Sequence, residues 1–289
     1  FIVSGRHSLI QPWANRFVPD SSILNIAFNQ LRYKFYDGNI KINQEFGPKN
    51  KLYGSFYLSG DQFFSPFSQK VTLTESYFQN QDTVASNWGN TISSLRWKYT
   101  RGDYLFANTT LSYSHFRYQS RLRHITDKYA DGRKTPVSDF AQLYQSDIRD
   151  LAIRSDFTYN IKKSLVTTFG YSAIYHIFKP GTLSVNYLLP RQDSLVALDS
   201  LINTLSKNKD FEAVESEVYG EATWQLAHQW ECTGGINASW FATDNTWYKA
   251  FSPRLKLLHG PAVETGWAQW ISYRQMVQYM HQIGSFNIG

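Results

Sequence analysis

Apolar and polar residues alternate along most of this chain of 289 residues, and this period of two restricts its fold more than any other feature. Successive side chains of a β-strand point to opposite faces, so the pattern predicts strands with different surroundings on their two faces. Between Leu105 and Tyr113, apolar side chains dominate the odd positions, while Asn108, Thr110 and Ser112 occupy even ones. The pattern recurs in about eleven segments. It therefore predicts an all-β, antiparallel protein.

The charged residues of these segments all fall on the polar side of the alternation. They are Asp37, Lys41, Glu45, Asp61, Arg96, Lys98, Arg154, Asp156, Glu217, Glu221, Glu231, Arg254 and Lys256. A charged side chain that faces lipid at mid-membrane costs about 2–4 kcal/mol, so its exclusion is expected of membrane strands. A soluble β-sandwich also keeps charges off its core face, and this pattern alone leaves both folds open.

Composition removes several other classes of protein. No apolar run approaches the roughly 20 residues of a membrane-spanning helix. Lys and Arg exceed Asp and Glu to give a net charge of +6, but they are scattered and do not form the basic stripe typical of nucleic-acid binding. The single cysteine, Cys232, excludes an internal disulfide and a cysteine-built zinc site. Aromatic residues at 17% and charged residues at 18% fit a transmembrane β-barrel.

The connections between the predicted strands are alternately short and long. Short turns are expected at 47–50, 101–103, 162–164, 227–229 and 259–261, and long connections at 9–28, 63–88, 118–147 and 179–214, with a shorter exception near 243–249. Short periplasmic turns and long extracellular loops are typical of outer-membrane barrels. The sequence thus predicts an antiparallel transmembrane β-barrel fragment in the cell outer membrane.

Four short segments resemble TonB-dependent outer-membrane receptors, especially those of Bacteroidetes-type bacteria. Residues 1–8 resemble the first barrel strand of that family, and 36–43 followed by 51–57 resemble the next hairpin. Residues 251–255 are similar to a recurring strand start, and 272–276 with Ile288 and Gly289 look like the mid-barrel segment. The resemblance extends along the whole chain, although each motif is short and degenerate.

The resemblance implies a barrel of about 22 strands that encloses an N-terminal plug. Residues 1–289 would then be a partial barrel domain of about eleven strands, with the plug and the C-terminal strands absent. The family takes up large, scarce solutes such as iron chelates, cobalamin, glycans or peptides. The implied partners are the TonB–ExbB–ExbD system through the plug, outer-membrane lipid and lipopolysaccharide, and a surface lipoprotein. Neither an enzyme activity nor a cofactor nor a nucleic-acid partner is expected.

Two alternatives stay open at this point. A passive porin-like channel or barrel adhesin would share the barrel but lack the plug. A soluble, aromatic-rich β-sandwich that binds glycans would share the alternation but not the membrane.

Two groups of residues are candidates for contacts with a solute or with another domain. The predicted 118–147 loop offers a basic surface for an anionic solute or for lipopolysaccharide, although plain solvation is an alternative. Its residues are Arg121, Arg123, His124, Lys128, Tyr129, Arg133 and Lys134. Polar-face residues of the strands would line the lumen and contact the plug or the solute. They are Arg96, Lys98, Arg154, Asp156, Arg254 and Lys256.

Three further patterns were weighed. Leucines between Leu195 and Leu205 have helical spacing and predict a lid or docking helix in the 179–214 connection. The histidines lack the spacing of a metal site. His176 and Ser172 share a strand face, but without a defined third partner they do not indicate a catalytic triad.

Overall fold

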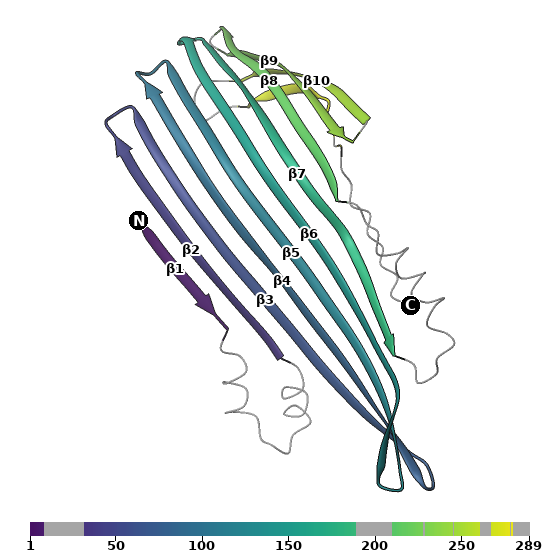
Figure 1. Cartoon of the computed structure of the whole chain (residues 1–289). Helices are drawn as coiled ribbons and strands as arrows, with labels where there is room; N and C mark the ends of the chain where they lie inside the picture. The colour runs from purple at the N-terminus through teal and green to yellow at the C-terminus, as the bar shows by residue number, and fades with distance from the viewer. Residues whose placement is uncertain are drawn as a thin grey trace.

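The computed structural model describes residues 1–8, 32–188, 210–227, 229–244, 246–260, 267–277 and 279. The predicted 9–28 connection and the predicted helix between Leu195 and Leu205 lie outside these residues. Figure 1 shows one broad, curved sheet whose strands run side by side in chain order.

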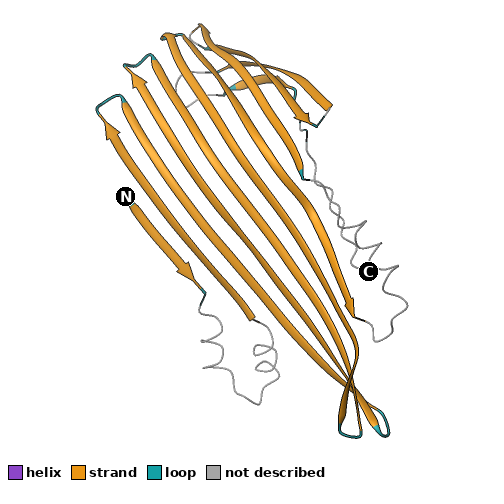
Figure 2. Cartoon of the chain, in the orientation of Figure 1, coloured by secondary structure: helices purple, strands orange, loops and turns teal. Residues whose placement is uncertain are grey.

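Eleven strands form this sheet, and each pairs antiparallel with its neighbours in sequence. They are β1 (Ile2–His7), β2 (Arg32–Phe46), β3 (Asn50–Thr72), β4 (Ser76–Arg101), β5 (Leu105–Ala130), β6 (Arg133–Lys162), β7 (Leu165–Leu188), β8 (Phe211–Ala227), β9 (Trp230–Thr243), β10 (Thr246–His259) and β11 (Gln269–Arg274). In Figure 2, strands and the turns that join them make up the described chain. The predicted all-β, antiparallel fold class is confirmed. No helix among the described residues is long and apolar enough to cross a membrane.

Strand register gives the sheet two chemically distinct faces. Leu95, Leu111 and Ile153 are register partners on β4, β5 and β6, and the face that carries them is called the Leu111 face. The opposite face is called the Arg154 face. All of the strand charges predicted to share one side do lie on the Arg154 face. The period-two pattern therefore assigned the faces correctly along nine strands.

The strands are staggered along the sheet. A row of register partners that starts at Phe46, the last residue of β2, climbs from strand to strand and reaches Pro253, well inside β10. Such a stagger is what a sheet of tilted strands requires, and closure into a barrel needs strands that tilt. In Figure 1 the sheet also bends, so that β8, β9 and β10 turn away from the plane of β2–β7.

The sheet is a single layer with almost no core. Among the described residues, Phe241 is the one buried hydrophobic side chain, whereas many large apolar side chains of the Leu111 face are exposed. Leu111 and Phe169 keep 47% and 45% of their surface accessible, and Ile236 keeps 52%. These side chains form a continuous apolar surface beside the short turns.

Two of the predicted long loops are wrong as to conformation. Residues 63–88 and 118–147 continue as paired strands that reverse in tight turns at 73–75 and 131–132. Asp131 and Gly132 have φ of 51° and 70°, the left-handed geometry of a two-residue type I′ hairpin turn. Both hairpins extend together to the lower end of the sheet in Figure 1. The predicted loop residues are therefore fixed on strands.

The orientation of residues 262–275, which the sequence left open, follows from β11. Ile271 and Tyr273 are register partners of Leu257 and Leu255 and lie on the Leu111 face. Trp270, Ser272 and Arg274 take the alternate positions.

Candidate functional site

The Arg154 face carries all six predicted lumen residues in the part of the sheet near the short turns. Arg96 and Lys98 lie on β4, Arg154 and Asp156 on β6, and Arg254 and Lys256 on β10. Register brings Arg154 and Asp156 together with residues of β7, β8 and β9. It keeps Arg96 apart, where its guanidinium lies 4.4 Å from the ring centre of Tyr53. Whether these residues contact a plug or a solute stays a prediction.

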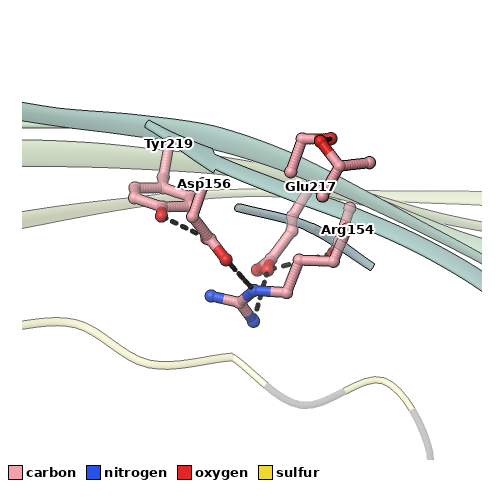
Figure 3. Close-up of polar contacts among 7 residues, drawn as sticks. Arg154, Asp156, Glu217 and Tyr219 are labelled. Carbon is pink, nitrogen blue, oxygen red and sulfur yellow. Dashed lines mark hydrogen bonds and ion pairs between the residues drawn. The ribbon is translucent and has the colours of Figure 1, made fainter. Parts of the chain in front are cut away.

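Arg154 lies at the centre of a network of polar side chains (Figure 3). Its Nε donates to both carboxylate oxygens of Asp156, at 3.1 and 3.0 Å, and its Nη1 lies 3.9 Å from Oε1 of Glu217. Ser172 Oγ and Asn237 Nδ2 each donate to Glu217 at 3.1 Å. The network thus joins four strands, β6 to β9, and holds the guanidinium between two carboxylates.

Tyr219 joins the network across a strand that lies between it and its partner. Its hydroxyl on β8 donates to Oδ1 of Asp156 on β6 at 2.5 Å. The register partner of both residues on the intervening strand β7 is Gly170. A Cβ at Gly170 would lie 2.8 Å from the Tyr219 ring and 2.5 Å from the carbonyl oxygen of Ser155. The glycine leaves the space through which the tyrosine reaches the aspartate.

The same device recurs two strands further on. Arg254 Nη1 on β10 lies 3.5 Å from Oε2 of Glu221 on β8, and Gly235 on β9 is the register partner of both. A Cβ at Gly235 would lie 2.9 Å from the carbonyl oxygen of Gly220 and 3.0 Å from Cβ of Glu221. Glycine inside a strand often marks such a close approach.

A second cluster on this face surrounds His176. Its Nδ1 lies 2.7 Å from Oδ1 of Asp150, and its Nε2 lies 3.9 Å from Oε2 of Glu215. Ser114 donates to the other oxygen of Asp150 at 3.3 Å. The imidazole therefore lies between two carboxylates, and Ser172 bonds to Glu217 instead, so His176 and Ser172 form no nucleophile pair. No group of three or more metal-ligating side chains occurs among the described residues.

Carboxylates outnumber fixed cations on this wall. Asp150, Asp156, Glu215, Glu217 and Glu221 face Arg154 and Arg254. The surplus negative charge suits a partner that presents cations or hydrogen-bond donors. Sequence reasoning recognised the glutamates as polar-face charges but missed Tyr219, Asp150 and His176 as members of the site, because their contacts depend on register across several strands.

The seven predicted residues of the 118–147 region do not form one surface. Arg121, Arg123, Tyr129 and Lys134 lie on the Leu111 face, whereas His124, Lys128 and Arg133 lie on the Arg154 face. Several of them are already paired across strands, as in Arg123 with Asp139 at 2.7 Å and Lys134 with Asp127 at 2.9 Å. The hydrogen bond from Arg123 lowers the pKa of the Asp139 carboxyl below its ordinary value. Their predicted contact with a solute or lipopolysaccharide remains untested.

The two faces exchange character in the distal hairpins, defined here as residues 59–90 and 116–148. On the Arg154 face, aromatic side chains become frequent: Phe63, Phe67, Phe78, Trp88, Phe116, Tyr118, Phe140 and Tyr144. Tyr118 and Tyr144 have ring centres 5.9 Å apart, and Trp88 lies 6.3 Å from Tyr33 of β2. On the Leu111 face, charged residues appear instead. Sequence reasoning missed this exchange because it treated both segments as loops.

Neither a protein-family model nor a curated protein sequence matches this chain. Solved structures of similar shape include the ferripyoverdine receptor of the Pseudomonas aeruginosa outer membrane bound to ferripyoverdine, with 10% identity over 84% of this chain and 40% of that one, and a TM-score of 0.47. The FrpB iron transporter of Neisseria meningitidis aligns at 11% identity over 84% and 43%, with a TM-score of 0.37. BauA, the ferric preacinetobactin receptor of Acinetobacter baumannii, aligns at 10% identity over 81% and 44%, with a TM-score of 0.37. The chain spans less than half the length of each.

Proposed function

We propose that this chain is part of the barrel wall of an outer-membrane receptor that takes up a large, scarce solute. One observation carries the proposal: beside the short turns, the Leu111 face of the sheet is apolar and free of charge, while the Arg154 face opposite it is charged. An outer-membrane barrel has this arrangement, with apolar side chains toward lipid and polar side chains toward the lumen.

The height of the apolar surface fits a membrane. On β5 the apolar positions run from Leu105 to Tyr113, and Arg117 is the first cation beyond them. On β6 they run from Ile161 to Leu151, and Arg149 follows. A tilted transmembrane strand needs about 9–11 residues, which both stretches provide. The 30 residues of β6 would extend about 100 Å, so much of this strand projects beyond a hydrocarbon core about 30 Å thick.

A soluble glycan-binding sandwich fits the structure poorly. A sandwich buries the facing sides of two sheets against each other. The described residues form one sheet, and its large apolar side chains are exposed. The membrane supplies the partner that this surface lacks.

The two parts of the Arg154 face suggest two tasks. The acid-rich wall around Arg154, Asp156 and Glu217 lies at membrane height and offers docking groups for a plug. The aromatic side chains of the distal hairpins stand farther out, where they offer stacking and apolar contacts to an arriving solute. In this proposal the TonB–ExbB–ExbD system supplies energy for uptake, because the outer membrane holds no ATP.

Solute uptake by cells distinguishes this proposal from a passive channel. A strain that lacks the gene is compared with its parent for accumulation of labelled ferric chelates, cobalamin, oligosaccharides and peptides. We expect loss of one solute class, and an equal loss in a parent strain that lacks TonB. Restoration by the wild-type gene is the control for indirect effects of the deletion.

Accumulation that persists without TonB, together with ohmic conductance of the purified protein in planar bilayers, would overturn energised uptake in favour of a passive pore. Unchanged accumulation of every class would leave an adhesin as the better account. Either result leaves the proposed membrane placement of the Leu111 face intact.

A further inference from the structure

One strand passes through three kinds of surface in the order that a lipid molecule presents them. Along the Leu111 face of β5, Leu111 is followed by Tyr113, then His115, then Arg117 and Arg121. Apolar, aromatic and basic side chains in this order match acyl chains, the membrane interface and an anionic headgroup. Arg117 lies just past the stretch that is long enough to span the membrane.

A trough crosses the Leu111 face at the height of Arg117. Its lining includes Tyr36, Gly60, Gly89, Arg117, Arg149 and Lys179, from strands β2 to β7. Gly60, Gly89, Arg117, Asp147 and Lys179 are successive register partners, so the trough runs across the strands along one row. The two glycines leave its floor without side chains.

Glycine is required at one position of this floor. A Cβ at Gly89 would lie 2.6 Å from the carbonyl oxygen of Ser59, a backbone atom that cannot move aside alone. At Gly60 the ring of Tyr36 covers the backbone, with ring atoms 2.5 to 2.7 Å from where a Cβ would be. The tyrosine ring therefore forms one end of the trough, and Arg117 stands beside the opposite glycine.

The distal part of this face is positively charged. On β2–β8 its cations are Arg32, Lys34, Lys70, Arg117, Arg121, Arg123, Lys134, Arg149 and Lys179, and its carboxylates are Asp127, Asp139, Asp147, Asp210 and Glu212. Within the part of the chain that the structure describes, neither Arg117 nor Arg121 forms an ion pair, and both side chains are exposed. Two guanidinium groups thus stay available for an external anion.

We propose that this trough binds the phosphate-bearing headgroup of an outer-leaflet lipid, with Arg117 and Arg121 contacting phosphate and the acyl chains lying along Leu111 and its neighbours. Guanidinium groups match phosphate geometry through paired hydrogen bonds. The inference rests on the proposed membrane placement of the Leu111 face, but not on energised uptake. The lipid would anchor the barrel wall at a fixed depth.

Lipid binding to the detergent-purified, folded protein tests the site. The probe is bis-phosphorylated lipid A, and the comparison lipid is the same molecule after enzymatic removal of its phosphates. We expect the phosphorylated lipid to bind at least about tenfold more tightly, and R117Q/R121Q to remove that preference. The matched control is K128Q/R133Q, which removes two charges of the same sign from the Arg154 face of the same hairpin and should leave lipid affinity unchanged.

Equal affinity for the two lipids, or an unchanged preference in R117Q/R121Q, would overturn the headgroup site. Inorganic phosphate that competes as well as the lipid at equal phosphate concentration would also overturn it, because the trough would then be a simple anion site. A protein that never folds in detergent or lipid would instead contradict the membrane placement. Heat-modifiable migration, recorded on every variant, separates these failures.

Discussion

A single arginine at Leu111 should impair insertion of this protein into lipid far more than an arginine at the next residue. We expect Leu111→Arg to lower the free energy of folding into bilayers by about 2–4 kcal/mol, the cost of an arginine that faces lipid near mid-membrane. Leu111 is 47% exposed, and its register partners are Leu95 and Ile153. The change corresponds to a shift of roughly 30- to 1,000-fold in the folding equilibrium.

Ser112→Arg is the matched control for Leu111→Arg. Ser112 lies on the Arg154 face opposite Ser94 and Ala152, where an added guanidinium meets polar neighbours and water. The folded fraction of each variant is measured by urea titration in phospholipid vesicles, with heat-modifiable migration as readout. Equal destabilisation by the two substitutions would contradict the assignment of the Leu111 face to lipid.

Replacement of Gly170 by alanine should have the second-largest effect. The added Cβ would lie 2.5 Å from a backbone oxygen and 2.8 Å from the Tyr219 ring, so the sheet must shift or the ring must leave. Such overpacking costs about 1–3 kcal/mol, and the hydrogen bond from Tyr219 to Asp156 is lost with it. The measurement is the same urea titration.

Gly220→Ala provides the control for this variant. Gly220 lies on the neighbouring strand β8, and a Cβ there would meet no atom within 4 Å. Because alanine restricts the unfolded chain, this variant should be unchanged or more stable by about 0.4–1 kcal/mol. If both alanine variants behave alike, the close approach at Gly170 does not exist in the folded protein. Tyr219→Phe should reproduce only the part of the loss that belongs to the hydroxyl.

The sequence was sufficient to identify the strands beside the short turns and the face of each residue. Every charge there obeys the period of two, since a side chain on the wrong face would either face the apolar surroundings or leave the polar wall. Residues 63–88 and 118–147 were missed for a physical reason: the apolar and polar positions exchange sides, so that aromatics take the alternate positions from those of Leu105–Tyr113. Asp131 and Gly132 did provide a hairpin signal, because this dipeptide favours a type I′ turn.

The contacts of the candidate site were only partly predictable. The alternation placed Arg154, Asp156 and Arg254 on one face correctly, since that depends on position within a strand. Their partners depend on the relative register of strands far apart in sequence, and on glycines that let side chains reach past an intervening strand. Nothing local to Tyr219 or Gly170 indicates that the two meet.

Lipid exposure along β5 tests the central claim most directly. Single cysteines are placed at successive positions from 105 to 124 in a protein whose Cys232 is replaced by serine, and each is labelled with a fluorophore in bilayers that contain brominated lipid. We predict strong quenching at odd positions from 107 to 113, little at the even positions between them, and none on either face beyond Arg117. Quenching that shows no alternation, or that continues unchanged to position 124, would contradict a Leu111 face in contact with lipid.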